Sequence, residues 1–376
     1  MDFKRVCRTA LETKGVLGEP WLAEAFDVVD RKEFTPDRIW TLDTNDDGLH
    51  SLVDRNKDHQ RWARAVYDSR RAVITQMDDG AVTPDGPAAG SFTSTISALD
   101  IVFEKLGHLE LDQGHRVWEL GTGSGYNTAL LCERVGSALI TSVEVDAALT
   151  TTAQANLKAA GYEPNVTCGN GELGDAQTAP HDRMISTASL LRIPGDWVQQ
   201  CAQDAIILTP FGTAYDNSGL LKLRVRDGIA EGNFVGNASY MWIRQQRPSR
   251  TIGELGDPRT AASVVDPYDV MQGPWQQDFA IGLRTQDLDY AHSGQGEEKQ
   301  LHVWDLAGTS SATITYRNWW EDRAVTARGP RDLWGEIVSA FTWYRVAGSP
   351  DIRHFGLTVS PAGQAVWLHT PDNIIA

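Results

Sequence analysis

Short apolar runs alternate with longer segments of helical spacing through the middle of the chain. The runs at residues 116–120 and 138–144 are mostly apolar, which is typical of strands buried in a sheet. The segment 147–160 repeats its apolar positions at helical spacing and stops at Gly161. Further strands are predicted at 166–168, 183–187 and 205–208, and a further helix at 97–106. This alternation predicts a parallel α/β sheet with helical crossovers.

A hairpin is predicted where this pattern ends. The runs 220–225 and 231–235 flank the dipeptide Asp227-Gly228, which is a strong signal for a tight turn between antiparallel strands. We therefore expect the parallel sheet to end in an antiparallel hairpin.

The two ends of the chain have different patterns. Residues 21–29 have helical apolar spacing, whereas residues 41–90 are rich in Asp, Gly and Pro and are predicted to be loop. Beyond residue 250, strands are predicted at 300–304 and 312–316, and an amphipathic helix at 332–344. Seven of the thirteen tryptophans also lie there, a density that favours a core and also allows a peptide-docking face.

The glycine-rich loop 121–125, with the sequence GTGSG, joins the run 116–120 to a helical segment at 126–132. Glycine lets the backbone turn tightly and approach a ligand, and the following helix N-terminus presents free N–H groups. The spacing GxGxG differs from the GxGxxG of dinucleotide sites. Glu144 ends the next predicted strand, where a carboxylate can bind ribose hydroxyls. The two features together predict an adenosine-type ligand.

Composition narrows the class of partner. The chain has 376 residues, enough for two or three domains, and a net charge of −16 with a pI near 5.0. This acidic balance argues against nucleic acid and anionic membranes as partners. The four cysteines form no metal-binding motif, and we expect no metal centre. Without a long apolar window or an apolar N-terminal segment, we expect a cytoplasmic protein.

Four segments, in order, resemble protein-L-isoaspartate O-methyltransferases. The stretch 116–127, RVWELGTGSGYN, closely resembles the family's first motif, and 142–146, SVEVD, matches its second. Residues 25–34 look like the family's N-terminal helix with its arginine and phenylalanine, and Thr95-Ile96-Ser97 looks like the motif before the first strand. The resemblance covers residues 20 to 250. It implies a Rossmann-like, class I methyltransferase that uses S-adenosyl-L-methionine and releases S-adenosyl-L-homocysteine.

The resemblance also implies roles in cofactor binding. The three glycines of the loop would form the floor under the cofactor. Glu119 would lie beside the methionine part, and Glu144 would hold the ribose. Asn170 would face the adenine in a position where the family usually has aspartate, and its amide oxygen can still accept a hydrogen bond. The full candidate set is Glu119, Gly121, Thr122, Gly123, Ser124, Gly125, Asn127, Glu144, Asn170 and Gly171.

On the substrate side, the resemblance points to Ser97, with Thr95 and Ser94 as further hydroxyls. Ser97 would donate a hydrogen bond to the carboxylate that accepts the methyl group. Serine and threonine before a helix also serve as N-caps, and this alternative stands beside the first. A carboxylate with a pKa of about 4 is already ionised at pH 7, so the reaction needs alignment and a dry pocket rather than a base.

Two departures from the family bear on the substrate. Residues 251–376 extend beyond the resembled region, and Ala98-Leu99 follows the serine where the family usually has a proline nearby. Segments 353–359 and 364–368 resemble the extension of relatives that act in ribosomal peptide maturation. Those relatives methylate an ordinary aspartate side chain, whose ester then cyclises to aspartimide as methanol leaves.

The leading hypothesis is therefore aspartimide formation in a ribosomally synthesised precursor peptide. Residues 1–90 would cover the active site, 91–250 would bind the cofactor, and 251–376 would form an additional α+β domain that recognises the peptide. Repair of isoaspartate is the alternative, and a non-catalytic cofactor-binding scaffold is a third hypothesis; the loop spacing disfavours an NAD-dependent reductase. The identity of the peptide, its prior cyclisation by another maturation enzyme and the oligomeric state stay open.

Overall fold

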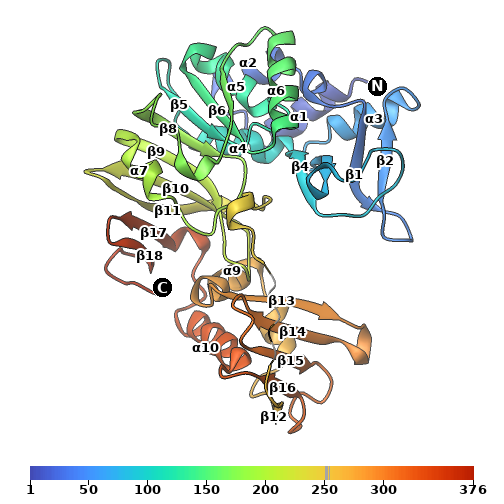
Figure 1. Ribbon diagram of the computed structural model, residues 1–376, viewed down its shortest axis with the longest axis vertical. Coiled ribbons are helices and arrows are strands. Elements are labelled where there is room, and N and C mark those ends of the chain that lie inside the picture. Colours follow the sequence, from blue (N-terminus) through green and yellow to red (C-terminus); the bar gives the residue numbers. More distant parts are fainter. Residues whose placement is uncertain (250–252, 254) are drawn as a thin grey trace. The chain divides into compact units, whose positions relative to one another are not determined.

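The computed structural model describes residues 1–249, 253 and 255–376, which fall into two compact units (Figure 1). The first unit comprises residues 1–188, 194–208 and 224–228. The second comprises residues 189–193, 209–223 and 229–376. The units do not follow the three predicted regions, because residues 1–90 belong to the same unit as the glycine-rich loop.

A parallel sheet forms the centre of the first unit. Its strands run in the order β9-β8-β5-β6-β7, with parallel pairing throughout. The strands are β5 (Val117–Leu120), β6 (Ile140–Glu144), β7 (Asn165–Cys168), β8 (His181–Ser186) and β9 (Cys201–Phe211). The helices are α4 (Leu99–His108), α5 (Tyr126–Val135), α6 (Ala147–Ala159) and α7 (Gly195–Gln199). Strand β5 is buried along its whole length, as its apolar run predicts.

The predicted hairpin is confirmed as β10 (Gly219–Arg226) and β11 (Ile229–Asn237). Asp227 and Gly228 both have positive φ, 51° and 75°, the backbone that a two-residue hairpin turn requires. The whole sheet has the order β18-β17-β11-β10-β9-β8-β5-β6-β7. Strands β17 (Phe355–Ser360) and β18 (Gly363–Leu368) pair antiparallel beyond β11, an extension that the sequence pattern did not predict.

Loop was predicted for residues 41–90, and this prediction is wrong. An antiparallel sheet with the order β2-β1-β3-β4 lies there, with a helix between β2 and β3. The elements are β1 (Arg38–Thr44), β2 (His50–Asp54), α3 (His59–Val66), β3 (Val73–Met77) and β4 (Phe92–Ile96). Trp40, Ile74 and Met77 form a small core for this sheet. That the region covers the active site stays a prediction.

Two helices and a short 3-10 helix precede this sheet. They are α1 (Phe3–Lys14), α2 (Pro20–Val28) and η1 (Arg31–Phe34). Asp2 caps α1 by accepting a hydrogen bond from the Arg5 amide at 3.0 Å. The remaining 3-10 helices of the described chain are η2 (Asp78–Gly80), η3 (Ser137–Leu139), η4 (Gly171–Leu173), η5 (Arg244–Gln246), η6 (Gly296–Glu298) and η7 (Ile352–His354).

The second unit contains a further antiparallel sheet with the order β12-β16-β15-β14-β13. Its strands are β12 (Arg259–Ala261), β13 (Leu288–Ser293), β14 (Gln300–Asp305), β15 (Ser311–Thr315) and β16 (Val325–Arg328). Helices α8 (Pro267–Met271), α9 (Trp275–Arg284) and α10 (Leu333–Val346) accompany it. Strands β14 and β15 and helix α10 confirm the three elements predicted in this region. No helix among the described residues is long and apolar enough to span a bilayer.

The tryptophans of this unit divide between core and surface. Trp334 and Trp367 are buried, and Trp334 belongs to the core that joins α10 to the sheet. Trp320 is 62% exposed. The prediction of a tryptophan-rich core therefore holds for part of the set only.

Candidate cofactor and substrate site

The glycine-rich loop needs glycine at each of its three positions. Gly121, Gly123 and Gly125 have φ values of 88°, 56° and 91°. A Cβ at Gly121 would clash with the Thr187 hydroxyl, and one at Gly125 would lie 3.0 Å from the Leu157 side chain. The space beside Gly123 is open, with no atom within 4 Å. The backbone at Gly123 therefore leaves room for a ligand to approach closely.

The end of the loop leads directly into α5. Gly125 is the N-cap of this helix, and no side chain caps it. The first amides of α5 thus stay available to a ligand, at the positive end of the helix dipole. Helix α6 fixes Ser124, whose carbonyl accepts a hydrogen bond from Asn156 Nδ2 at 3.0 Å.

Glu119 lies beneath the loop and is fully buried. Its carboxylate accepts hydrogen bonds from Asn127 Nδ2 at 2.7 Å, Thr128 Oγ1 at 2.5 Å and Ser142 Oγ at 2.6 Å. Burial raises the pKa of Glu119, because desolvation disfavours the charged form. These bonds tie β5 to the first turn of α5 and to β6. That Glu119 lies close to the methionine part of the cofactor stays a prediction. Its role in ordering the loop follows from these three hydrogen bonds.

Lys105 of α4 is a buried cation that sequence reasoning missed. Its Nζ donates a hydrogen bond to the Ser186 carbonyl at 2.6 Å, and Glu119 provides a favourable opposite charge. Burial lowers the pKa of Lys105 to about 7. The sequence does contain a sign of this burial, because Lys105 lies on the apolar face of its helix with Val102 and Leu106.

Glu144 ends β6 beside the glycine-rich loop. Its Oε2 accepts a hydrogen bond from the Gly123 amide at 2.9 Å, and its Oε1 accepts one from the Asp146 amide at 3.1 Å. The residue is buried, and the Gly169 amide donates to its carbonyl at 2.9 Å. The predicted ribose-binding carboxylate therefore touches the open glycine of the loop.

The predicted adenine contact lies at the end of β7, the strand that pairs with β6. Asn170 is exposed, and its Oδ1 accepts a hydrogen bond from the Glu172 amide at 3.0 Å. Gly171 is buried, and a Cβ there would overlap the side chain of Leu120 in β5. The candidate residues at the ends of β5, β6 and β7 are thus brought to one edge of the sheet, where open α/β sheets bind ligands.

The three hydroxyl candidates, two in β4 and Ser97 directly after it, have different environments. Ser94 is buried, and its Oγ accepts a hydrogen bond from Thr75 Oγ1 at 2.8 Å. Thr95 and Ser97 are partly exposed, and neither hydroxyl has a hydrogen-bond partner among the residues that the structure describes. The N-cap of α4 is Ala98, so Ser97 is not the cap. Ser97 and Thr95 therefore keep hydroxyls that a substrate can use.

Arg31 fixes the backbone that carries Ser97. The guanidinium is buried and donates to the carbonyls of Val66 at 2.8 Å, Ile96 at 2.9 Å and Ser97 at 2.9 Å. The arginine was noted in the sequence as part of a motif, without a role. Its contacts give it one, namely to position the segment after β4.

Two contacts join this substrate-side segment to the cofactor-side loop. Phe34, in the same 3-10 helix as Arg31, packs against Tyr126, the first residue of α5, with ring centroids 5.8 Å apart. Gln76 of β3 donates from Nε2 to Asp146 Oδ2 at 3.3 Å, just after Glu144. These contacts tie the elements around Ser97 to the first turn of α5 and to the residue after β6. That the Ser97 hydroxyl faces the same ligand as the glycine-rich loop stays a prediction. No group of three or more His, Cys, Asp or Glu side chains within the described ranges could hold a metal ion.

This arrangement fits an S-adenosyl cofactor. The open space at Gly123 and the uncapped start of α5 leave room for a ligand's backbone contacts. Glu144 and Asn170 offer oxygen acceptors at the same sheet edge. The glycines as the floor, Glu144 as the ribose contact and Asn170 as the base contact stay predictions, and the positions of these residues at one sheet edge agree with them.

Known proteins resemble the chain in fold and in sequence. A solved structure described as protein-L-isoaspartate O-methyltransferase superposes with a TM-score of 0.54 at 18% identity, covering 98% of this chain and 100% of that one. At this identity the likeness shows the fold alone.

Curated relatives are more similar in sequence. The protein-L-isoaspartate O-methyltransferase of Methanococcus vannielii is 34% identical over 146 residues, which are 38% of this chain and 70% of the relative. The protein-L-isoaspartate O-methyltransferase 1 of Archaeoglobus fulgidus is 33% identical over 174 residues, 44% of this chain and 81% of the relative.

The family model for protein-L-isoaspartate(D-aspartate) O-methyltransferase matches residues 52–246, which is just over half of the chain. This span contains the glycine-rich loop, Glu144, Asn170 and the Thr95-Ile96-Ser97 segment. The cofactor of this family is S-adenosyl-L-methionine. The chain therefore belongs to the protein-L-isoaspartate(D-aspartate) O-methyltransferase family and is an S-adenosylmethionine-dependent protein carboxyl O-methyltransferase.

Proposed function

We propose that this chain methylates the free carboxylate of an isoaspartyl residue in a peptide or protein. The observation that carries the proposal is the Ser97 hydroxyl, which has no hydrogen-bond partner among the described residues and whose backbone is fixed by Arg31. A hydroxyl in this state can donate to an incoming carboxylate without first losing another bond. The curated relatives support isoaspartate as the substrate, since their names give this activity.

The residues of the chain orient the substrate rather than activate it. The bound cofactor supplies an electrophilic methyl carbon on a positively charged sulfur. Ser97, with Thr95 beside it, holds the ionised carboxylate, and no general base is needed at pH 7. The loop glycines, Glu144 and Asn170 hold the cofactor, while Glu119 orders the loop from below. Alignment of this kind can be worth roughly 7–11 kcal/mol in well-oriented systems.

A second candidate is methylation of an ordinary aspartate in a ribosomally synthesised precursor peptide, followed by cyclisation to aspartimide. Ala98-Leu99 after Ser97 favours it, because the family usually has a proline nearby. The resemblance of segments 353–359 and 364–368 to peptide-maturing relatives favours it too. The length of the chain does not favour the second candidate, since a solved structure described as a protein-L-isoaspartate O-methyltransferase aligns over 98% of this chain.

Mass spectrometry with two peptides tests both candidates. The full-length protein and S-adenosylmethionine are incubated with an isoaspartyl peptide and, separately, with the same sequence containing normal aspartate. A gain of one methyl group on the isoaspartyl peptide alone supports the proposal. Methylation of the normal aspartate, followed by methanol loss, supports the second candidate, with a cyclised version of the peptide as a further arm.

The Ser97→Ala variant is the control for both peptides. It keeps the cofactor site and removes only the hydroxyl that the proposal places on the substrate. If S-adenosylhomocysteine binds to the unmodified protein and neither peptide is methylated, both candidates fail, and methylation of a different carboxylate and a non-catalytic scaffold are the explanations to compare next.

A further inference from the structure

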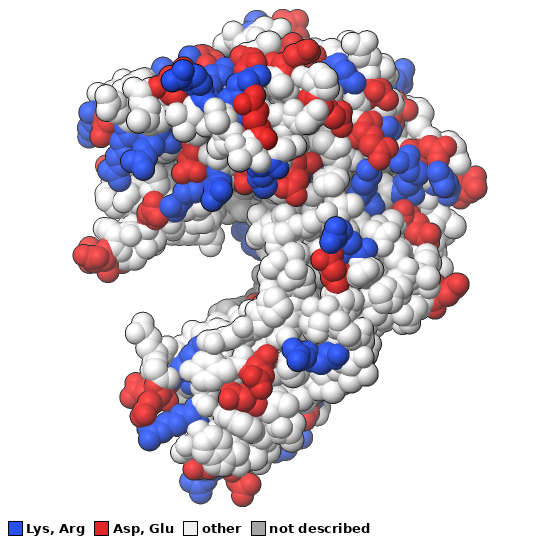
Figure 2. All heavy atoms as spheres, turned by 180° about the vertical axis from the view of Figure 1, so that it is seen from behind, with Lys and Arg blue, Asp and Glu red and all other residues white. Residues whose placement is uncertain are grey.

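The segment around α3 is basic in a chain that is otherwise strongly acidic. Residues 55–71 contain six Lys or Arg and two Asp, a net charge of +4, whereas the whole chain has −16. Lys57, Arg61 and Arg64 are exposed, and none forms an ion pair within the described residues. Figure 2 shows Lys and Arg side chains gathered at the upper left of its view, over this part of the first unit. These three residues are called the α3 basic surface.

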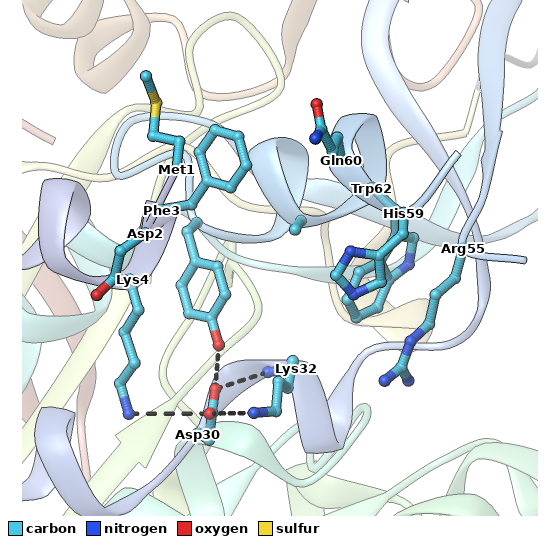
Figure 3. Close-up of a pocket in the computed structure, with 12 residues that line it drawn as sticks. Met1, Asp2, Phe3, Lys4, Asp30, Lys32, Arg55, His59, Gln60 and Trp62 are labelled. Carbon is cyan, nitrogen blue, oxygen red and sulfur yellow. Dashed lines mark hydrogen bonds and ion pairs between the residues drawn. The ribbon is translucent and has the colours of Figure 1, made fainter. Parts of the chain in front are cut away.

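A cavity of about 560 Å³ adjoins this surface. Figure 3 shows its two walls. On one wall, Asp30 pairs with Lys32 at 2.9 Å and with Lys4 at 3.9 Å, and also accepts a hydrogen bond from the Tyr67 hydroxyl. On the other wall, the Arg55 guanidinium lies 4.7 Å from the centre of the Trp62 ring. Each of the three cations of the cavity has a carboxylate partner, Asp30 for Lys4 and Lys32 and Asp37 for Arg55. The cavity therefore combines paired charges with aromatic surface, and the unpaired cations lie on the adjoining α3 basic surface.

The cavity and the α3 basic surface are continuous. His59, Gln60 and Ala63 of α3 line the cavity. Arg64 follows Gln60 by four residues on the same helix, so the two side chains are neighbours on its surface. A ligand in the cavity can thus extend along the row of free cations.

Arg31 connects the cavity with the substrate side of the active site. Asp30 and Lys32, on either side of Arg31 in the chain, line the cavity. The Arg31 side chain bonds to the carbonyls of Val66, which precedes the cavity residue Tyr67, and of Ser97. One buried side chain therefore contacts the residue that precedes the cavity residue Tyr67 and also the segment proposed to hold the substrate carboxylate.

We propose that the α3 basic surface and its cavity dock an acidic segment of the peptide substrate, outside the residue that is methylated. The inference rests on the proposed function, because it takes a peptide as substrate. Charge complementarity selects the occupant: a chain with a net charge of −16 repels an acidic peptide over most of its surface, and this basic area gives it a place to approach. The aromatic rings of the cavity give the docked segment apolar contacts.

Steady-state kinetics with paired peptides test the proposal. One is an isoaspartyl peptide with neutral flanking residues, and the other carries a run of glutamates at one end. The glutamate tail is expected to lower KM roughly tenfold without a change in kcat, and about 0.5 M NaCl is expected to remove this advantage. Arg61→Glu/Arg64→Glu is expected to abolish the advantage of the tail and to leave the KM of the neutral peptide unchanged.

Lys158→Glu/Arg345→Glu is the matched control. It makes the same change in net charge at two exposed positions, outside the α3 basic surface, that form no ion pair in the described chain. The control should keep the full advantage of the tail. Equal KM values for the two peptides with the unmodified protein, or equal losses in both double variants, would overturn the docking site.

A binding measurement separates this inference from the proposed function. Fluorescence anisotropy with a labelled glutamate peptide that contains no aspartate or isoaspartate reports docking without methyl transfer. Binding that R61E/R64E abolishes supports the docking site even if no isoaspartyl peptide is turned over. A salt-sensitive dimer in analytical ultracentrifugation that R61E/R64E dissociates would instead identify a second copy of this chain as the occupant, and would overturn the proposal.

Discussion

At the scale of single residues, identical side chains near β4 have different uses. The hydroxyl of Ser94 is bonded to Thr75 inside the sheet, whereas that of Ser97 is free of protein partners in the described chain. The motif Thr95-Ile96-Ser97 contains only the second of these serines, and Ser94 was predicted as a further hydroxyl beside it. The difference arises because β4 ends at Ile96, so that Ser97 leaves the sheet while Ser94 stays within it.

The Ser97→Ala variant is expected to lose activity without losing stability. A hydrogen bond to a charged group contributes about 1.5–3 kcal/mol, so kcat/KM should fall roughly 10- to 100-fold. Because the hydroxyl has no partner in the described protein, the free energy of unfolding should change by less than about 0.5 kcal/mol. Steady-state methylation and urea unfolding measure the two effects. Ser94→Ala should lose more stability and less activity than Ser97→Ala, because its hydroxyl is bonded to Thr75. Full activity of the Ser97→Ala protein would show that Ser97 does not bind the substrate.

Lys105 makes the stability of the protein depend on pH. Its pKa is about 7 in the folded state and about 10.4 when unfolded, so between these values the unfolded chain binds more protons. Stability therefore rises with pH in this range, by up to about 1.4 kcal/mol per pH unit from this group. Urea unfolding of the unmodified protein and of Lys105→Met at several pH values isolates the contribution. Parallel pH profiles for the two proteins would contradict the assignment.

At the scale of elements, the sequence predicted the parallel sheet well and the N-terminal sheet poorly. Buried strands such as β5 are apolar along their length, which makes them easy to predict. The loop after β5 has three glycines at positive φ, a backbone conformation that other residues rarely adopt. Strands β1 and β3 are irregular, because their register shifts between Trp40 and Thr44 and around Gln76. A strand with a bulge does not keep the alternation of period two, so its pattern reads as loop.

The residues of the candidate site also divide into those that the sequence could predict and those that it could not. Residues fixed by local spacing, such as Glu144 and the loop glycines, could be placed from the sequence. The contacts of Arg31 with Ile96 and of Lys105 with Ser186 join residues 65 and 81 positions apart in the chain, and local patterns carry no information on such contacts.

Gly123→Ala is expected to damage cofactor binding more than folding. The residue has φ of 56° and open space around it, so a methyl group costs about 1–2 kcal/mol of backbone strain and then occupies the ligand side of the loop. Gly161→Ala is the matched control, with φ of 86° and equally open space after α6. Both variants should lose similar stability by thermal unfolding. Calorimetric affinity for S-adenosylhomocysteine should fall only in Gly123→Ala, by roughly tenfold or more; equal affinities would place the cofactor away from Gly123.

At the scale of the whole molecule, the region after residue 250 is not a simple appendage. Strand β17 pairs with β11, so the C-terminal part of the chain completes a sheet that begins in the methyltransferase sequence. Phe279 and Phe355 also belong to this region. Phe279 packs against Phe234 of β11 with ring centroids 4.8 Å apart, and Phe355 packs against Phe279 at 6.2 Å. Deleting the region therefore removes part of a core as well as any peptide-binding surface.

A chain that ends at residue 250 is accordingly expected to aggregate. It loses the strand that covers the edge of β11, and an uncovered edge is a template for association between chains. It also exposes Phe234, which is fully buried in the intact protein. Size-exclusion chromatography and S-adenosylhomocysteine binding check this outcome. The intact chain, in which β17 covers the edge of β11, is the control and should elute without the aggregate. A well-behaved 1–250 fragment with undiminished cofactor affinity would mean that the C-terminal region folds as a separate addition, and peptide recognition could then be assigned to it by deletion alone.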